Sequence, residues 1–94
     1  MNKFQNPKEK TESQYSTEGM ILEKLVARFR IGSPIINYFE LKESIGSPLA
    51  KNIDEALRNL KDHSIIYSSD GINYSITETG ISEFERRKNA GLLF

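Results

Sequence analysis

The chain has 94 residues, a length that suits one compact domain, and 37% of its residues are hydrophobic. It contains no cysteine and one histidine, which excludes a disulfide framework and a thiolate metal site, and no apolar run approaches the roughly 18–20 residues of a membrane span. Its 13 basic residues balance its 13 acidic residues, whereas a dedicated nucleic-acid-binding domain is usually basic.

Residues 1–16 differ in composition from the rest of the chain. They are rich in Lys, Gln, Asn and Glu, and their only large apolar or aromatic groups are Met1, Phe4 and Tyr15. Such a composition predicts a flexible polar arm, so the folded domain is expected over residues 17–94. The arm has no apolar segment of the kind found in a secretion signal, and we expect a cytoplasmic protein.

The first part of the domain has the spacing of a helix. Apolar residues recur at i, i+3, i+4 and i+7 over residues 18–30, and Thr17 can cap the N-terminus of this helix. Gly32 and Pro34 end it, and the β-branched pair at residues 35–36 favours a short extended segment. The apolar stripe consists of Leu22, Leu25, Val26 and Phe29.

Two further helices are predicted next. Asn37 and Glu40 have the spacing of a capping box, which indicates a short helix over residues 38–45 that ends at a glycine. A serine–proline pair then favours the start of a third helix over residues 47–63. Its apolar stripe consists of Ile53, Ala56, Leu57 and Leu60.

The pattern then changes from helical to alternating. Two runs rich in β-branched and aromatic residues flank Asp70-Gly71, which predicts a hairpin with a two-residue turn. A threonine after the hairpin can cap a last helix over residues 78–89. The predicted cross-strand pairs are Ile65 with Ile76, Tyr67 with Tyr74, and Ser69 with Ile72.

This order of elements predicts an α+β fold with a three-helix core, a two-stranded β-hairpin and a C-terminal helix. Residues 53–66 (IDEALRNLKDHSII) resemble the recognition helix and the start of the next strand in winged-helix transcription regulators. Residues 74–80 (YSITETG) are similar to the Tyr-x-Leu-Thr-x-x-Gly segment that closes the wing in MarR- and PadR-like regulators. The resemblance spans residues 17–89. It implies a homodimeric winged helix-turn-helix regulator that binds specific sequences of double-stranded DNA with the third helix in the major groove. Its role would be transcription regulation or DNA organisation and segregation.

The resemblance assigns roles to the polar side of the third helix. The N-terminal half of a recognition helix reads bases, so Lys51 and Asn52 are the candidates for contacts with base edges. Ser47 is expected to bond a phosphate at the start of the helix, and Arg58 to hold the DNA backbone. Glu55 can accept a hydrogen bond from cytosine.

The remaining candidates lie beside this face and on the hairpin. Asn59 is on the flank of the third helix. Ser69 and Asn73 can donate to phosphate from a hairpin tip that has no Lys or Arg. Arg58 stands four residues after Asp54 and three after Glu55, spacings that favour an ion pair within the helix for either acid.

The apolar segment Leu92-Leu93-Phe94 predicts an association surface that suits a homodimer.

An alternative to a DNA-binding homodimer stays open. The neutral charge, the acids of the third helix and the uncharged hairpin tip instead favour a protein-interaction subunit of a larger complex that does not bind DNA. The sequence has no nucleophile–base pair and no Gly-rich nucleotide loop, so we expect no enzyme, no cofactor and no small-molecule substrate.

Overall fold

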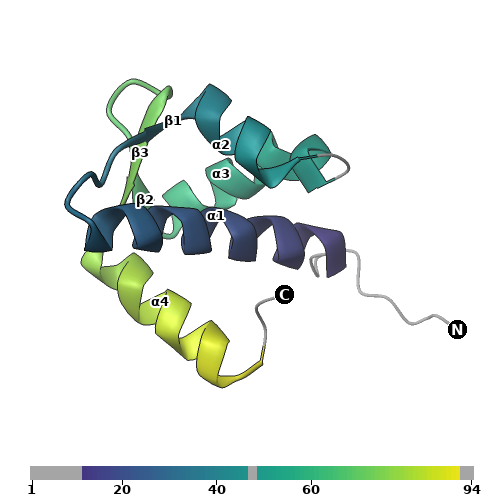
Figure 1. The fold of residues 1–94 in the computed structure, drawn as a ribbon. Coiled ribbons are helices and arrows are strands. Elements are labelled where there is room, and N and C mark those ends of the chain that lie inside the picture. The colour runs from purple at the N-terminus through teal and green to yellow at the C-terminus, as the bar shows by residue number, and fades with distance from the viewer. Residues whose placement is uncertain (1–11, 47–48, 92–94) are drawn as a thin grey trace, which may run out of the picture.

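Residues 12–46 and 49–91 are described by the computed structural model of the chain (Figure 1). In chain order their elements are α1 (Glu12–Arg30), β1 (Ile36–Asn37), α2 (Tyr38–Ile45), the 3₁₀ helix η1 (Leu49–Asn52), α3 (Ile53–Asp62), β2 (Ile66–Tyr67), β3 (Asn73–Ile76) and α4 (Glu78–Asn89). The architecture of these residues is α+β. In Figure 1, α1 crosses the middle of the molecule, with α2 and α3 on one side and α4 on the other. Within these residues, no helix combines the length and apolar character that crossing a membrane requires.

The first helix begins earlier than predicted. It starts at Glu12 rather than at residue 18, so part of the expected polar arm is helical, and residues 1–11 lie outside the described residues. Thr17 does not cap this helix. It is buried within it, and its hydroxyl donates to the carbonyl oxygen of Leu49 at 3.0 Å. A residue that favours caps is accommodated inside the helix because its hydroxyl has this tertiary partner.

The apolar stripe of α1 is confirmed except at its C-terminal end. Leu22, Leu25 and Val26 are buried, together with Ile21, which the prediction left out. Phe29 was expected to join them, but it is 48% exposed. The buried stripe therefore ends one turn before the helix does, and the last turn carries an aromatic side chain at the surface.

The second helix has the predicted bounds and the predicted cap. Oδ1 of Asn37 accepts a hydrogen bond from the backbone N–H of Glu40 at 2.9 Å. Leu41 and Ile45 are buried. Gly46 follows with a φ of 77°, a conformation that glycine adopts without steric cost, so the helix ends there as predicted.

The third helix is shorter than predicted. Residues 47–48 lie outside the described residues, η1 comes next, and α3 itself begins at Ile53 and ends at Asp62. A 3₁₀ segment is frequent at the start of an α-helix, and here the N–H of Ala50 in η1 also donates to the carbonyl oxygen of Gly46 at 2.9 Å. The inner face of α3 is as predicted, with Ile53, Ala56, Leu57 and Leu60 buried.

The sheet has three strands rather than the two of the predicted hairpin. Its order is β1-β3-β2, with β3 in the centre. Ile36 lies opposite Tyr74 and Asn37 lies opposite Asn73 in antiparallel register. The sequence indicated an extended segment here but not its partner, because β1 has only two residues and pairs with a strand far along the chain.

The predicted register of the hairpin is wrong by one residue. Ile66 lies opposite Ile76, and Tyr67 lies opposite Ser75 rather than Tyr74. The loop is longer than a two-residue turn, because Oδ1 of Asp70 accepts the backbone N–H groups of both Ile72 and Asn73 at 2.8 Å and replaces cross-strand backbone bonds. A shift of one residue reverses the faces of a strand, so Tyr74 is buried whereas Tyr67 is 59% exposed.

The last helix is capped as predicted and packs closely on the sheet. Oγ1 of Thr77 accepts the backbone N–H of Gly80 at 2.9 Å, and α4 runs from Glu78 to Asn89. Phe84 is buried, whereas Ile81 is half-buried. Gly80 lies against the strand region so closely that a Cβ atom there would be 2.0 Å from the carbonyl oxygen of Ile65. The predicted apolar segment at residues 92–94 lies outside the described residues.

Candidate nucleic-acid interface

The outward side of α3 forms a surface of mixed charge. Burial of the apolar stripe fixes the orientation of the helix, because the residues on the opposite side must then point outward. We call this surface, with the preceding turn of η1, the outer face of α3. Its exposed charged residues are Lys51, Asp54, Glu55, Arg58, Lys61 and Asp62.

Arg58 differs from the other four arginines of the chain in its surroundings. Each of the others forms an ion pair with a carboxylate, whereas no carboxylate among the described residues lies within 4.0 Å of the Arg58 guanidinium. Arg58 therefore carries a positive charge that the described part of the protein does not pair. The paired arginines are Arg28 with Glu40, Arg30 with Glu85, Arg86 with Glu83, and Arg87 with Glu18 and Glu83.

The ion pair expected between Asp54 and Arg58 is absent from the described residues, and Asp54 has a different partner. Oδ1 of Asp54 accepts a hydrogen bond from the hydroxyl of Tyr38, the first residue of α2, at 2.7 Å. This hydrogen bond to a carboxylate, with smaller contributions from burial and from the negative charge, raises the pKa of Tyr38. The contact joins α2 to the first turn of α3.

A hollow of about 180 Å³ lies between α3 and β3. It is lined by the two cations Arg58 and Lys61 and by one acid, Asp54. Tyr74 of β3 forms part of its wall, and burial, followed by the negative charges of Asp54 and Asp70, raises the pKa of this tyrosine. The hollow therefore brings two positively charged side chains, Arg58 and Lys61, close to Tyr74.

The residues predicted to contact DNA at the start of α3 differ from one another in exposure. Lys51 is exposed on η1, and Glu55 is exposed in the first turn of α3. Asn52 is half-buried at the N-cap position of α3, where its side chain makes no capping hydrogen bond. Ser47, the predicted phosphate ligand, lies outside the described residues.

Asn59 was expected to contact DNA, but the structure turns it toward the interior. Its Nδ2 donates to Oε2 of Glu18 at 2.9 Å, and Glu18 is only 1% exposed. The other oxygen of Glu18 pairs with the buried guanidinium of Arg87 at 3.0 Å. A signal for this cluster was present in the sequence, because Glu18 shares the helical spacing of Leu22 and Leu25 and therefore faces the core.

The hairpin tip is stabilised by hydrogen bonds among its own polar groups. Nδ2 of Asn73, the second expected phosphate donor, binds Oδ2 of Asp70 at 2.8 Å instead. The backbone N–H groups of Asn73 and Ile72 also hold the pKa of Asp70 well below its usual range. The tip therefore carries a negative charge, and both predicted donors, Ser69 and Asn73, are exposed there.

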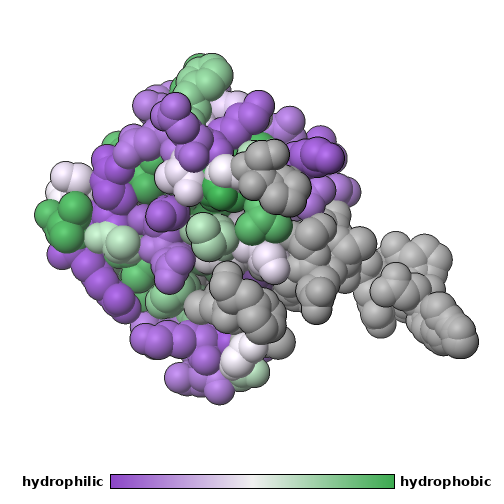
Figure 2. All heavy atoms as spheres, turned by 45° about the vertical axis from the view of Figure 1, so that its right-hand side comes forward, coloured by the Kyte–Doolittle hydropathy of each residue, from purple (hydrophilic) through white to green (hydrophobic). Residues whose placement is uncertain are grey.

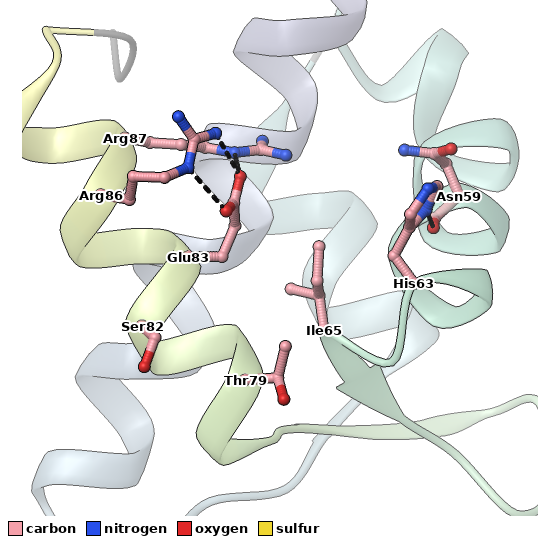
Figure 3. Close-up of a pocket in the computed structure, with 8 residues that line it drawn as sticks. All are labelled: Asn59, His63, Ile65, Thr79, Ser82, Glu83, Arg86 and Arg87. Atoms are coloured by element: carbon pink, nitrogen blue, oxygen red, sulfur yellow. Dashed lines mark hydrogen bonds and ion pairs between the residues drawn. The ribbon is translucent and has the colours of Figure 1, made fainter.

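A second and larger groove, of about 540 Å³, lies between the C-terminal end of α3 and α4 (Figure 3). Its two arginines point toward Glu83, which lies 2.7 Å from nitrogen atoms of both guanidiniums. These contacts lower the pKa of Glu83 to about 2. The cations of this groove are thus already paired, unlike those of the α3–β3 hollow. The lining residues are Asn59, His63, Ile65, Thr79, Ser82, Glu83, Arg86 and Arg87.

Comparison with known proteins identifies no family for this chain. No protein-family model, no curated protein and no solved structure matches it.

Proposed function

We propose that the chain is a winged helix-turn-helix protein that binds double-stranded DNA as a homodimer, with α3 in the major groove. In this proposal α2 and α3 are the helix-turn-helix, and the β2–β3 hairpin is the wing. The observation that carries the proposal is the outer face of α3. Arg58 and Lys61 line a hollow there without an ion-pair partner among the described residues, while the other arginines of the chain are paired.

The positions of the side chains support a division of roles. Lys51 precedes α3, where it can reach the guanine acceptors O6 and N7 in the major groove. Arg58 and Lys61 lie further along the same side, where they can hold a backbone phosphate and fix the orientation of the helix. Ser69 and Asn73 are the exposed wing residues available for a phosphate contact, because Nδ2 of Asn73 keeps a second N–H beside the one it donates to Asp70.

Net charge sets the expected character of the binding. A neutral chain has little long-range attraction for DNA, so its non-specific affinity should be low. The proposed contacts involve a small number of phosphates. We therefore expect a shallow dependence of affinity on salt, together with discrimination between sequences that comes from the start of α3.

The test is binding of the full chain to a pool of mixed duplexes and then to the tightest-binding sequence selected from it. Between about 50 and 200 mM salt, the log–log slope should change by about 0.9 for each phosphate contact that is lost. Arg58→Ala should weaken binding to every sequence, and Lys51→Ala should reduce the preference for the selected one. Lys88→Ala, at an exposed position on α4, is the matched control and should bind like the wild type.

A second candidate function, the protein-interaction subunit, is favoured by the exposed apolar side chains. Six large hydrophobic residues of the described chain are between 48% and 74% exposed. On the face shown in Figure 2 the hydrophobic residues lie at several separate places among hydrophilic ones. This candidate predicts that the wild type binds no duplex even at low salt. The six residues are Phe29, Ile31, Ile35, Phe39, Tyr67 and Ile72.

A further inference from the structure

Tyr38 lies where α2, α3 and the hairpin meet. Its hydroxyl binds Asp54 of α3 at 2.7 Å, and its backbone N–H donates to the carbonyl oxygen of Ile72 in the hairpin loop at 2.7 Å. Its ring packs edge-on against that of Phe39 at 5.4 Å, and the ammonium group of Lys42 lies 5.8 Å from its ring centre. The tyrosine is therefore fixed by several contacts rather than by the hydroxyl alone.

The position of Asp54 matters for the cations of the α3–β3 hollow. Asp54 and Arg58 are four residues apart on one helix, the spacing at which opposite charges form ion pairs, and both line the hollow. No such pair is formed, because the carboxylate of Asp54 is held by Tyr38 from the neighbouring helix. Without this hydrogen bond, the four-residue spacing would favour an ion pair between the carboxylate of Asp54 and the guanidinium of Arg58.

We infer that Tyr38 is a positioning residue for DNA binding: its hydroxyl holds Asp54 apart from Arg58, so that Arg58 and Lys61 stay available for a backbone phosphate at the hollow. This inference rests on the proposed function. Tyr38 itself does not need to touch DNA. Its hydroxyl instead affects how many cations on the outer face of α3 are available to bind phosphate. An ion pair between Asp54 and Arg58 would compete with phosphate for the same guanidinium.

The experiment measures the affinity of the full chain for a labelled duplex over a series of salt concentrations. Tyr38→Phe keeps the ring and removes the hydroxyl. We expect it to weaken binding about two- to fivefold, the range set by an exposed ion pair, and to lower the salt slope by up to about 0.9. Arg58→Ala should give the same change of slope, and combining the two substitutions should add nothing further.

A second variant separates this positioning role from a structural one. Asp54→Asn removes the charge that competes for Arg58, so it should bind DNA at least as tightly as the wild type, and Tyr38→Phe should have no effect in its background. Tyr67→Phe is the matched control, since the Tyr67 side chain is 59% exposed and makes no hydrogen bond within the described residues.

The outcomes distinguish the inference from the proposed function. The inference alone is overturned if wild-type and Tyr38→Phe chains bind with equal affinity and slope while Arg58→Ala is weaker. It is also overturned if Tyr38→Phe weakens binding equally in the Asp54→Asn background, or if Asp54→Asn itself weakens binding. If the wild type binds no duplex at low salt, the proposed function fails, and the inference fails with it.

Discussion

Arg87 of α4 forms a buried ion pair with Glu18 of α1, with Nη1 and Oε1 at 3.0 Å. Their side chains are 5% and 1% exposed. The same carboxylate also accepts from Asn59 of α3, so this cluster joins three of the four α-helices: α1, α3 and α4. A carboxylate in such a place depends on its partners, because an uncompensated charge away from water is strongly unfavourable.

Replacing Arg87 by methionine should therefore lower the free energy of unfolding by about 3–5 kcal/mol, because it breaks the buried ion pair with Glu18 and removes the cation 3.0 Å from that carboxylate. Urea denaturation followed by circular dichroism measures the change. Arg86→Met is the control, since the Arg86 side chain is 61% exposed and its ion pair should contribute less than about 1 kcal/mol. Equal effects of the two substitutions would contradict a special role for the buried pair.

Gly80 is required by the close approach of α4 to the strand region. An added Cβ would lie 2.0 Å from the carbonyl oxygen of Ile65 and 2.6 Å from Cγ1 of Ile76. Gly80→Ala should therefore destabilise the fold by about 1–3 kcal/mol, although alanine is the better helix former. Thermal unfolding measures this, with Ser82→Ala at an exposed position of the same helix as control. A stabilised Gly80→Ala variant would show that the contact is looser than described.

Thr77 both caps α4 and joins it to the chain before β2. Its hydroxyl oxygen accepts from Gly80 at 2.9 Å and lies within 3.0 Å of the carbonyl oxygen of Ile65. Thr77→Ala should cost about 1–2 kcal/mol, whereas Thr77→Ser should retain most of the stability because it keeps the hydroxyl. Chemical denaturation of the two variants tests this. Equal losses would assign the effect to the methyl group.

The pH dependence of stability should include a contribution from Glu83. Its pKa is about 2 rather than 4.5, because Arg86 and Arg87 favour the charged form. A lowered pKa stabilises the folded state above pH 4.5, and this stability is lost as the pH falls toward about 2. Glu83→Gln should therefore flatten the free energy of unfolding across that range, measured by urea denaturation at several pH values. Glu43→Gln, exposed on α2, should leave the wild-type dependence unchanged.

Local signals in the sequence were sufficient for much of the helical framework. The Asn37 cap, the end of α2 at Gly46 and the inner face of α3 follow from side-chain chemistry within a few residues, and each is confirmed. The predicted start of α1 was wrong because Thr17 is a residue type that often caps helices. Its hydroxyl instead donates to the carbonyl oxygen of Leu49, a partner that no local pattern reveals.

The candidate site was harder to predict because its polar residues choose among partners that are distant in sequence. Asn59 binds Glu18, and Asp54 binds Tyr38 rather than Arg58. The hairpin shows the same limit at short range. The carboxylate of Asp70 accepts hydrogen bonds from the backbone and the side chain of Asn73. These bonds stabilise a longer loop, and the register is shifted by one residue from the predicted one. Helical spacing gives the side of a helix on which a residue lies, but not which of several polar partners it binds.

The most direct test of the proposed function is a titration of the isotope-labelled chain with a short duplex at low salt, followed by amide chemical shifts. The proposal predicts that the perturbed residues cluster on the outer face of α3, around Lys51, Arg58 and Lys61, and at Ser69 of the hairpin. Amides on the α1–α4 side should stay unchanged. An absence of shifts at any duplex concentration, or shifts confined to α4, would contradict DNA binding through α3.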